Sequence, residues 1–192
     1  MPDNDILLAR HGQTEWSVNG RHTGHTDIPL TDEGRVQAKA LGARFGGIEF
    51  ALVLSSPLAR ALDTCRLAGL GDVAVEDPDL KEWDYGEYEG ITSDDIHQTR
   101  PGWTVWADGA PGGESPEQVG IRADRVVERL EAADGLCAVF GHGHMLRVLA
   151  ARWVGMPTAA GAKFALSPAT LSGLGREHDD RVLSLWNDGS HF

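Results

Sequence analysis

The sequence predicts an α/β fold, specifically a three-layer α/β/α sandwich with a mixed, mostly parallel central sheet. Short apolar runs alternate with segments of helical periodicity, which is typical of a sheet covered by helices on both faces. The strand candidates are short and largely apolar throughout, as expected for strands buried on both faces. The length of 192 residues, with 41% hydrophobic residues, suits a single domain over 1–192 with a sizeable core.

The first third of the chain is expected to form a strand, a helix and a second strand. The apolar run 6–9 suits a buried strand, and Thr31 or Asp32 can cap a following helix that Gly46 and Gly47 would stop. The apolar positions at helical spacing in that helix are Val36, Ala40 and Ala43. A second strand is expected at 52–54.

The next segment is expected to hold a helix, a short strand and a long irregular region. Ser56 is a candidate cap and Pro57 fits the first helical position of a helix that should end near Gly69. Residues 73–75 are a third strand candidate. Residues 78–114 are rich in Asp, Gly, Trp and Tyr and are predicted to form an irregular, lid-like insertion.

The carboxyl-terminal half begins with the clearest helix signal in the sequence. Ser115 followed by Gln118 has the form of a capping box. The apolar positions that follow mark one helical face: Val119, Ala123, Val126 and Leu130. A buried strand is expected at 136–140, a helix through Leu146 and Leu149 up to Gly155, and two further strands around 170–171 and 182–185.

Charge and cysteine content exclude several classes of protein. With 17 Lys and Arg against 29 Asp and Glu, the net charge is −12, which argues against nucleic acid or anionic membrane as a partner. The start of the chain is acidic and its apolar run is too short for a secretory signal or a membrane span. Cys65 and Cys137 show no paired spacing, so buried reduced thiols and a cytoplasmic location are expected.

Polar side chains follow three of the predicted strands. Arg10 and His11 come after the first strand, Arg60 just beyond the second, and His142 after the strand at 136–140. Ligands in such folds bind beyond the carboxyl ends of the strands, so these residues are expected to meet at one site. Two arginines, two imidazoles and Glu82 from the insertion together offer what phosphoryl transfer requires: cationic donors, a nucleophile and an acid.

Four ordered motifs resemble those of the histidine phosphatase superfamily, which includes the cofactor-dependent phosphoglycerate mutases. Residues 8–16 (LARHGQTEW) resemble its opening motif, and Arg21, Gly24, Asp27, residues 29–31 and Gly34 resemble its continuation. Residues 55–61 (SSPLARA) resemble its second arginine segment, residues 80–90 (LKEWDYGEYEG) its acid-bearing segment, and residues 140–143 (FGHG) its second histidine. The resemblance implies the phosphoglycerate mutase-like fold.

The resemblance also implies a mechanism that needs no metal and no cofactor. His11 would attack phosphorus and become a phosphohistidine, which water then hydrolyses, while Glu82 serves as the acid and then the base. Arg10, Arg60 and His142 would stabilise the phosphoryl oxygens. The implied substrate-binding and phosphate-binding positions are Arg10, Ser17, Thr23, Gly24, Arg60, Glu82, Tyr85 and Gly143. The expected activity is that of a metal-independent, acid phosphatase-type phosphomonoester hydrolase.

Departures from the family pattern leave two alternatives open. Ser17 stands where Asn is common, His144 stands where mutases usually carry Asn, and Arg100 is the one strong cation between Gly90 and Ser115. Mutases retain a bisphosphate intermediate with more cations in that region, so hydrolysis of a small phosphomonoester is favoured over phosphoglycerate mutase activity. A catalytically silent module that binds a phosphorylated ligand is the third reading. An apolar edge near the carboxyl-terminal strands would permit a homodimer.

Overall fold

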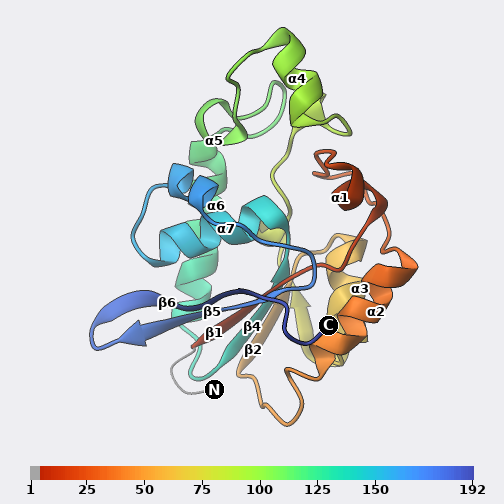
Figure 1. The fold of residues 1–192 in the computed structure, drawn as a ribbon. Helices are drawn as coiled ribbons and strands as arrows, with labels where there is room; N and C mark the ends of the chain where they lie inside the picture. The colour runs from red at the N-terminus through yellow and green to blue at the C-terminus, as the bar shows by residue number, and fades with distance from the viewer. Residues whose placement is uncertain (1–4) are drawn as a thin grey trace.

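A six-stranded sheet runs through the centre of residues 5–192, the part of the chain that this computed structural model describes (Figure 1). The strands lie in the order β3-β2-β4-β1-β5-β6. Their bounds are β1 Ile6–Arg10, β2 Leu52–Ser55, β3 Ala74–Glu76, β4 Cys137–Gly141, β5 Leu171–Glu177 and β6 Asp180–Asp188. The first four pair in parallel, while β5 runs antiparallel to both β1 and β6. The predicted mixed, mostly parallel sheet is therefore confirmed.

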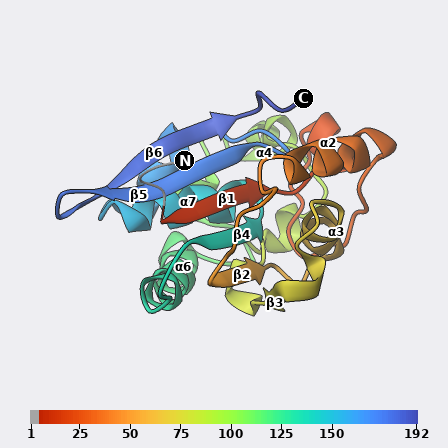
Figure 2. The same ribbon diagram turned by 90° about the horizontal axis from the view of Figure 1, so that it is seen from below.

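Helices cover both faces of this sheet, and the view from below shows its strands lying side by side in the order given above (Figure 2). Alternate side chains of β1 point to opposite faces, so Leu7 packs in one core with α2 (Asp32–Gly42) and α3 (Ala59–Leu67). Leu8 packs in the other core with α6 (Pro116–Glu131) and α7 (Gly143–Trp153). Each strand is thus buried on two sides, which explains why the strand sequences are apolar runs rather than alternating patterns.

Helix α6 has the start and the apolar face that the sequence predicts. The Ser115 hydroxyl accepts a hydrogen bond from the Gln118 backbone N–H, and the Gln118 side chain accepts one from the Ser115 N–H. All four predicted apolar positions are buried: Val119, Ala123, Val126 and Leu130. The cap was predictable because its hydrogen bonds are local, and the apolar face was predictable because the helix packs on the sheet along that face.

The predicted face of α2 is wrong, although its cap at Thr31 is confirmed. Val36 is 60% exposed, and the buried positions are instead Gly34, Ala38 and Leu41. A Cβ atom on Gly34 would lie 2.1 Å from the Gln13 carbonyl oxygen, so the helix approaches that backbone too closely for any side chain. Gly34 and Ala38 carry little hydrophobic signal, so the stripe predicted from Val36, Ala40 and Ala43 lay on the wrong side of the helix.

The predicted cap of α3 is also wrong. The helix begins at Ala59 after Leu58, and no side chain within the segment caps it. The Ala59 N–H instead donates to Oδ1 of Asp27, a residue distant in sequence, at 2.9 Å. Ser56 lies before the helix and bonds to His142 through its hydroxyl. The local pattern of Ser followed by Pro could not reveal a cap supplied by another loop.

Residues 78–114 hold more regular structure than the sequence predicts. They contain the 3₁₀ turns η2 (Pro78–Leu80) and η3 (Gly86–Tyr88) and the helices α4 (Ser93–Thr99) and α5 (Val105–Asp108). Helix α4 begins with a capping box between Thr92 and Asp95 that composition alone obscured. In Figure 1 this segment stands beyond one end of the sheet, with α1 (Glu15–Asn19) close by.

The last two strands are longer than predicted and form an antiparallel hairpin. The short elements not yet described are η1 (Gly71–Val73) and η4 (Thr158–Lys163). Both cysteines, Cys65 and Cys137, are free and buried, as expected. Within residues 5–192 no helix combines the length and the apolar character needed to span a membrane.

Candidate active site

The parallel strands end at one level, and this register brings the sequence motifs together. Arg10 at the end of β1 lies opposite Gly141 at the end of β4, and the next residue on each strand is a histidine. The His11 N–H donates to the Gly141 carbonyl at 3.0 Å, which continues the pairing past the strand. The rings of His11 and His142 consequently lie 5.3 Å apart between their centroids. The predicted convergence at the carboxyl end of the sheet is therefore observed.

His11 is buried and held in one tautomer. Its Nδ1 lies 2.7 Å from the Gly12 carbonyl oxygen, which can only accept, so Nδ1 carries the proton and Nε2 keeps a free lone pair. Burial, together with the positive charges of Arg10 and Arg60, holds the pKa of His11 well below its usual range. The ring is therefore neutral around pH 7, as a nucleophile requires.

The backbone beside His11 is fixed by close packing. The Gly12 N–H donates to the Thr64 hydroxyl of α3 at 3.0 Å, and that hydroxyl donates to the Arg60 carbonyl at 2.7 Å. A Cβ atom on Gly12 would lie 2.4 Å from the carbonyl oxygen of Gly34. These contacts hold the His11 loop against α2 and α3, and they explain the glycines of the opening motif.

Arg10 lines a cavity of about 290 Å³ at this end of the sheet. One terminal nitrogen of its guanidinium donates to the Leu166 carbonyl. Its buried Nε has no hydrogen-bond partner in the described chain. An unpaired guanidinium N–H beside a neutral histidine is suited to an anionic group, because leaving such a donor buried and unpaired is costly.

Arg60 and His142 lie behind His11 and do not line the cavity. The Arg60 Nε–H donates to Nδ1 of His142 at 3.1 Å, and Nε2 of His142 lies 2.7 Å from the Ser56 hydroxyl. The remaining Arg60 donors bind the carbonyls of a single loop, at Thr23, Gly24 and Thr26. Burial lowers the pKa of His142, and Arg60 adds to the effect. Their direct contact with a phosphoryl group stays a prediction.

Glu82 lines the cavity with its carboxylate fixed by three backbone donors. Oε1 accepts from the Trp83 and Met145 N–H groups, both at 2.9 Å, and Oε2 accepts from the His144 N–H at 3.0 Å. Two of these donors belong to the first turn of α7, where unpaired N–H groups and the helix dipole favour an anion. The helix that follows His142 thereby positions the carboxylate predicted to serve as the acid.

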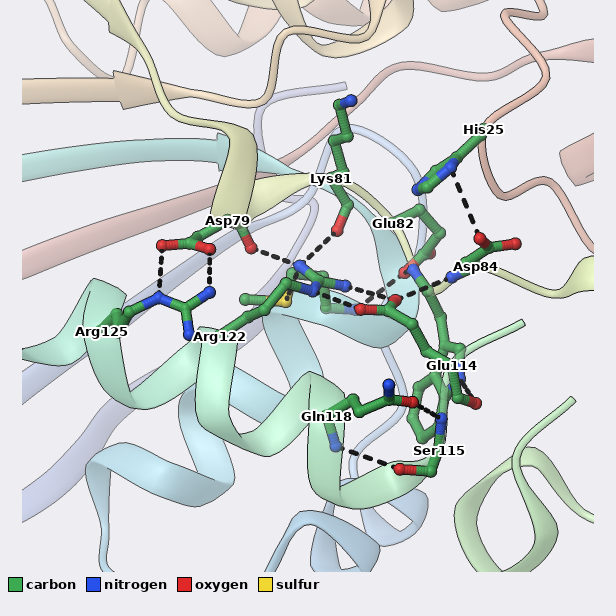
Figure 3. Close-up of polar contacts among 12 residues, drawn as sticks. His25, Asp79, Lys81, Glu82, Asp84, Glu114, Ser115, Gln118, Arg122 and Arg125 are labelled. Atoms are coloured by element: carbon green, nitrogen blue, oxygen red, sulfur yellow. Dashed lines mark hydrogen bonds and ion pairs between the residues drawn. The ribbon is translucent and has the colours of Figure 1, made fainter. Parts of the chain in front are cut away.

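A network on α6 supports the Glu82 segment from the far side (Figure 3). Arg122 forms two bonds with the Glu114 carboxylate, from Nε to Oε1 at 2.7 Å and from Nη2 to Oε2 at 2.8 Å. Its Nη1 donates to the backbone carbonyls of Asp79 and Lys81, directly before Glu82. Arg122 thus joins the two ends of the 78–114 segment to one helix.

The other predicted binding residues divide into two groups. Ser17, Thr23, Tyr85 and Gly143 line the cavity. The Ser17 hydroxyl donates to the Thr14 carbonyl, so its donor is engaged in capping α1. Gly24 does not line the cavity; its N–H donates to the carboxylate of Glu89.

Several cavity residues were not predicted from the sequence. They are Trp16, Arg21, His22, Ser93 and Arg147, while His144 lies at the start of α7 beside the pocket as expected. Arg21 belongs to the continuation of the opening motif and could have been found there. Arg147 is five residues beyond His142, on α7, and only helical geometry turns it toward the cavity.

Within residues 5–192, His, Cys, Asp and Glu side chains form no group of three or more that could hold a metal ion. The polar groups that face the cavity are instead guanidinium, imidazole, hydroxyl and carboxyl groups. Such a set matches a phosphate group, whose oxygens accept hydrogen bonds from guanidinium and imidazole donors.

Comparison with known proteins agrees with this geometry. The family model of the histidine phosphatase superfamily (branch 1) matches residues 6–189. An acid phosphatase of Mycobacterium tuberculosis is 45% identical over 186 residues, covering 94% of this chain and 90% of the relative. The sedoheptulose 1,7-bisphosphatase of Saccharomyces cerevisiae is 36% identical over 78% of this chain and 67% of its own. Phosphoglycerate mutases also align, such as one from Gloeobacter violaceus at 36% identity over 75% of this chain.

The fold is shared with solved structures. The product of an open reading frame of Mycobacterium tuberculosis superposes with a TM-score of 0.90 at 44% identity, covering 95% of this chain and 96% of that one. The acid phosphatase is 45% identical over 94% of this chain, whereas the mutase is 36% identical over 75%, so the mutase alternative is less supported. The motifs, the convergent site and these matches lead to one conclusion: this chain belongs to branch 1 of the histidine phosphatase superfamily and is a phosphomonoester hydrolase.

Proposed function

We propose that this protein hydrolyses small phosphomonoesters in two steps through a phosphohistidine at Nε2 of His11. In the first step the Nε2 lone pair forms a bond to phosphorus while the bond to the leaving oxygen breaks. Glu82 donates a proton to that oxygen. In the second step water attacks phosphorus, the N–P bond returns its electrons to Nε2, and Glu82 accepts the proton released by water.

The observation that carries this proposal is the state of the His11 ring. Its Nδ1 proton is committed to the Gly12 carbonyl, so the lone pair on Nε2 is the nucleophile. The positive charges of Arg10 and Arg60 disfavour protonation of the ring, because an imidazolium beside two guanidiniums would be repelled. Neutral His11 therefore persists even in mildly acidic solution, which suits an acid phosphatase type of activity.

Stabilisation of the phosphoryl group falls first to Arg10. Arg10 lines the cavity together with His11, and its buried Nε–H is unpaired, so this guanidinium can donate to a phosphoryl oxygen. Removing one such fixed donor typically lowers the rate by about 10²–10³. Arg60 and His142 would add positive charge from behind the ring, and their transfer to direct phosphate contacts would require Arg60 to release carbonyls of the 23–26 loop.

Glu82 is suited to proton transfer by the way its two oxygens are used. Oε1 accepts two backbone hydrogen bonds, whereas Oε2 accepts one. Since each carboxyl oxygen has two lone pairs, Oε2 retains room for a proton. The 78–114 segment that carries Glu82 stands over the end of the sheet and would serve as a lid over the bound substrate (Figure 1).

The two alternatives have less support. Phosphoglycerate mutase activity would need the phosphohistidine to be protected from water while the intermediate turns around. A silent binding module would not require His11 in its nucleophilic tautomer. The two free buried cysteines are consistent with a reducing compartment, and we place the activity in the cytoplasm.

The test is phosphate release in the presence of EDTA, with p-nitrophenyl phosphate as substrate and His11→Ala as the matched variant. We expect release by the wild type alone, together with a covalent phosphate that is stable in alkali and lost in acid. Equal release by both proteins would remove His11 as the nucleophile. Binding of vanadate without any release or phosphorylation would favour the silent module, and faster isomerisation of 3-phosphoglycerate than phosphate release would favour the mutase.

A further inference from the structure

Arg147 is a cavity cation that the proposed mechanism does not use. It lies on α7, and its Nε donates to the Gly161 carbonyl at 2.9 Å. Its guanidinium carbon lies 4.5 Å from the centre of the Trp106 ring, in a stacked cation–π position. In the part of the chain described, Nη1 and Nη2 of Arg147 form no hydrogen bond and the guanidinium forms no ion pair, although Glu82 acts on it as a more distant negative charge. This side chain is fixed in place, yet its outer donors are free.

The wall beside Arg147 is built from aromatic and imidazole rings. Trp106 lies 5.0 Å from the His144 ring, and His144 lies 6.3 Å from the His22 ring. The Tyr85 hydroxyl bonds to Nδ1 of His144 at 2.6 Å. Burial lowers the pKa of His22 and, more strongly, that of His144, so these rings are neutral near pH 7. The wall is therefore polar but uncharged, and Arg147 is the fixed charge at its edge.

Charge in the cavity departs from that of the molecule as a whole. The chain carries a net charge of −12, whereas the cavity is lined by three arginines and one carboxylate. Those arginines are Arg10, Arg21 and Arg147. One phosphoryl group beside His11 engages Arg10 and leaves the other two without an anion. Arg147 is half-buried and Arg21 is exposed. An excess of positive charge around a cavity favours a ligand that carries a second anionic group.

We propose that Arg147 forms a second anion-binding subsite, so that this enzyme prefers small phosphomonoesters that carry a further carboxylate or phosphate group. The inference rests on the proposed function, because it assigns the reactive phosphoryl group to Arg10 and His11. A guanidinium offers two parallel N–H donors that match either anion, and stacking on Trp106 fixes their plane before the ligand binds. The cavity of about 290 Å³ restricts the ligand to a compact molecule.

The first experiment compares matched substrates on the wild-type enzyme. 3-Phosphoglycerate and glycerol 3-phosphate differ by a carboxylate in place of a hydroxymethyl group. Fructose 1,6-bisphosphate and fructose 6-phosphate differ by a second phosphate. We expect a KM about 10- to 100-fold lower for the doubly anionic member of at least one pair, the range of one charge-assisted hydrogen-bonded pair. The pair with the larger ratio identifies the second anion.

The second experiment uses variants that separate this role from a structural one. Arg147→Gln should abolish the preference by raising KM for the doubly anionic substrates, while KM for p-nitrophenyl phosphate stays within about twofold. Arg147→Lys should recover part of the preference, since lysine restores the positive charge but not the two parallel N–H donors of the guanidinium. Arg152→Gln is the matched control on the same helix, because Arg152 pairs with Asp124 outside the cavity. It should leave both KM values unchanged.

The outcomes distinguish the two proposals. Absence of any His11-dependent release from p-nitrophenyl phosphate would overturn the proposed function. Normal release with equal KM values within both substrate pairs would overturn the Arg147 subsite alone, as would an Arg147→Gln enzyme that keeps the preference. Unfolding midpoints are measured for each variant, and if Arg147→Gln does not fold, the wild-type ratios and the Arg147→Lys variant decide.

Discussion

Replacing Arg122 by Met should destabilise the protein and loosen the segment that carries Glu82. The Arg122 side chain is 13% exposed and that of its partner Glu114 is 19% exposed, so the ion pair is largely removed from water. Met preserves much of the apolar stem of the side chain, while the Nη1 group that contacts Sδ of Met145 is lost. The substitution therefore removes mainly the charge and the hydrogen bonds shown in Figure 3.

The size of the effect follows from the groups left without a partner. Arg122→Met strands the Glu114 carboxylate and removes a donor from two backbone carbonyls, those of Asp79 and Lys81. Removing one partner of a buried ion pair costs about 3–5 kcal/mol, and the residual exposure here lowers that to about 2–4 kcal/mol. For a protein of this size, such a loss corresponds to a fall in Tm of roughly 4–16 °C.

A neighbouring arginine provides the control. Arg125 lies on the same helix and pairs with Asp79, but it is 46% exposed and Asp79 keeps a second partner in Arg129. Arg125→Met should therefore cost about 0–1 kcal/mol. Adding Glu114→Gln to Arg122→Met should restore about 1–2 kcal/mol, because the stranded charge is removed.

The assay is urea unfolding at pH 7 for the wild type and the three variants, with kcat measured on the same samples. We expect kcat for substrates with poor leaving groups to fall in Arg122→Met, because the backbone directly before Glu82 loses its anchor. Equal stability losses in Arg122→Met and Arg125→Met would refute the reasoning, since burial would then not distinguish the pairs. No rescue in the double variant would show that the charge of Glu114 is not the origin of the cost.

Three further predictions concern the site itself. Glu82→Gln should slow alkyl phosphates about 10²–10⁴-fold but aryl phosphates much less, as kcat on the two classes will show; an equal loss would exclude leaving-group protonation. Burial lowers the pKa of His11 and His142, and removal from water lowers that of the partly buried His144, so the unfolded chain binds more protons and stability should fall below pH 6.5. Between pH 7.5 and 5.5 each should remove about 1.4 kcal/mol in urea unfolding, and His144→Asn should cancel one such share. Gly34→Ala should destabilise by about 1–3 kcal/mol and reduce kcat, because its Cβ would overlap the backbone of the loop after β1; unchanged thermal unfolding would contradict that close approach.

The sequence alone placed the strands well and predicted a mixed, mostly parallel sheet, but the order of the strands came only from the structure. Apolar runs such as 6–9 and 136–140 could be recognised because strands buried on both faces have no polar side. The α6 capping box was equally clear, since both of its hydrogen bonds are local. The sequence patterns failed where a contact with a distant segment determines the local structure. These contacts are the Gln13 backbone beside Gly34 on α2 and the Asp27 side chain at the start of α3.

The site, too, was partly predictable from the sequence and partly determined by tertiary contacts. The four motifs identified Arg10, His11, Glu82 and the second histidine by residue type and order, because the chemistry requires those groups. Only the tertiary structure decided which ring nitrogen of His11 is free, since that depends on where the Gly12 carbonyl points. It also placed Arg60 behind the histidine, engaged with loop carbonyls, which no motif spacing could predict.

The sequence did not predict the roles of two arginines that reach the site region from helices α6 and α7. Arg122 and Arg147 belong to helical patterns in which an arginine is ordinarily a solvated residue. Packing turned one toward the 78–114 segment and the other into the cavity. The sequence therefore determined the reaction class, because reacting groups must be of particular types. The tertiary structure decided the protonation, support and charge of the site, because these depend on distances between segments far apart in the chain.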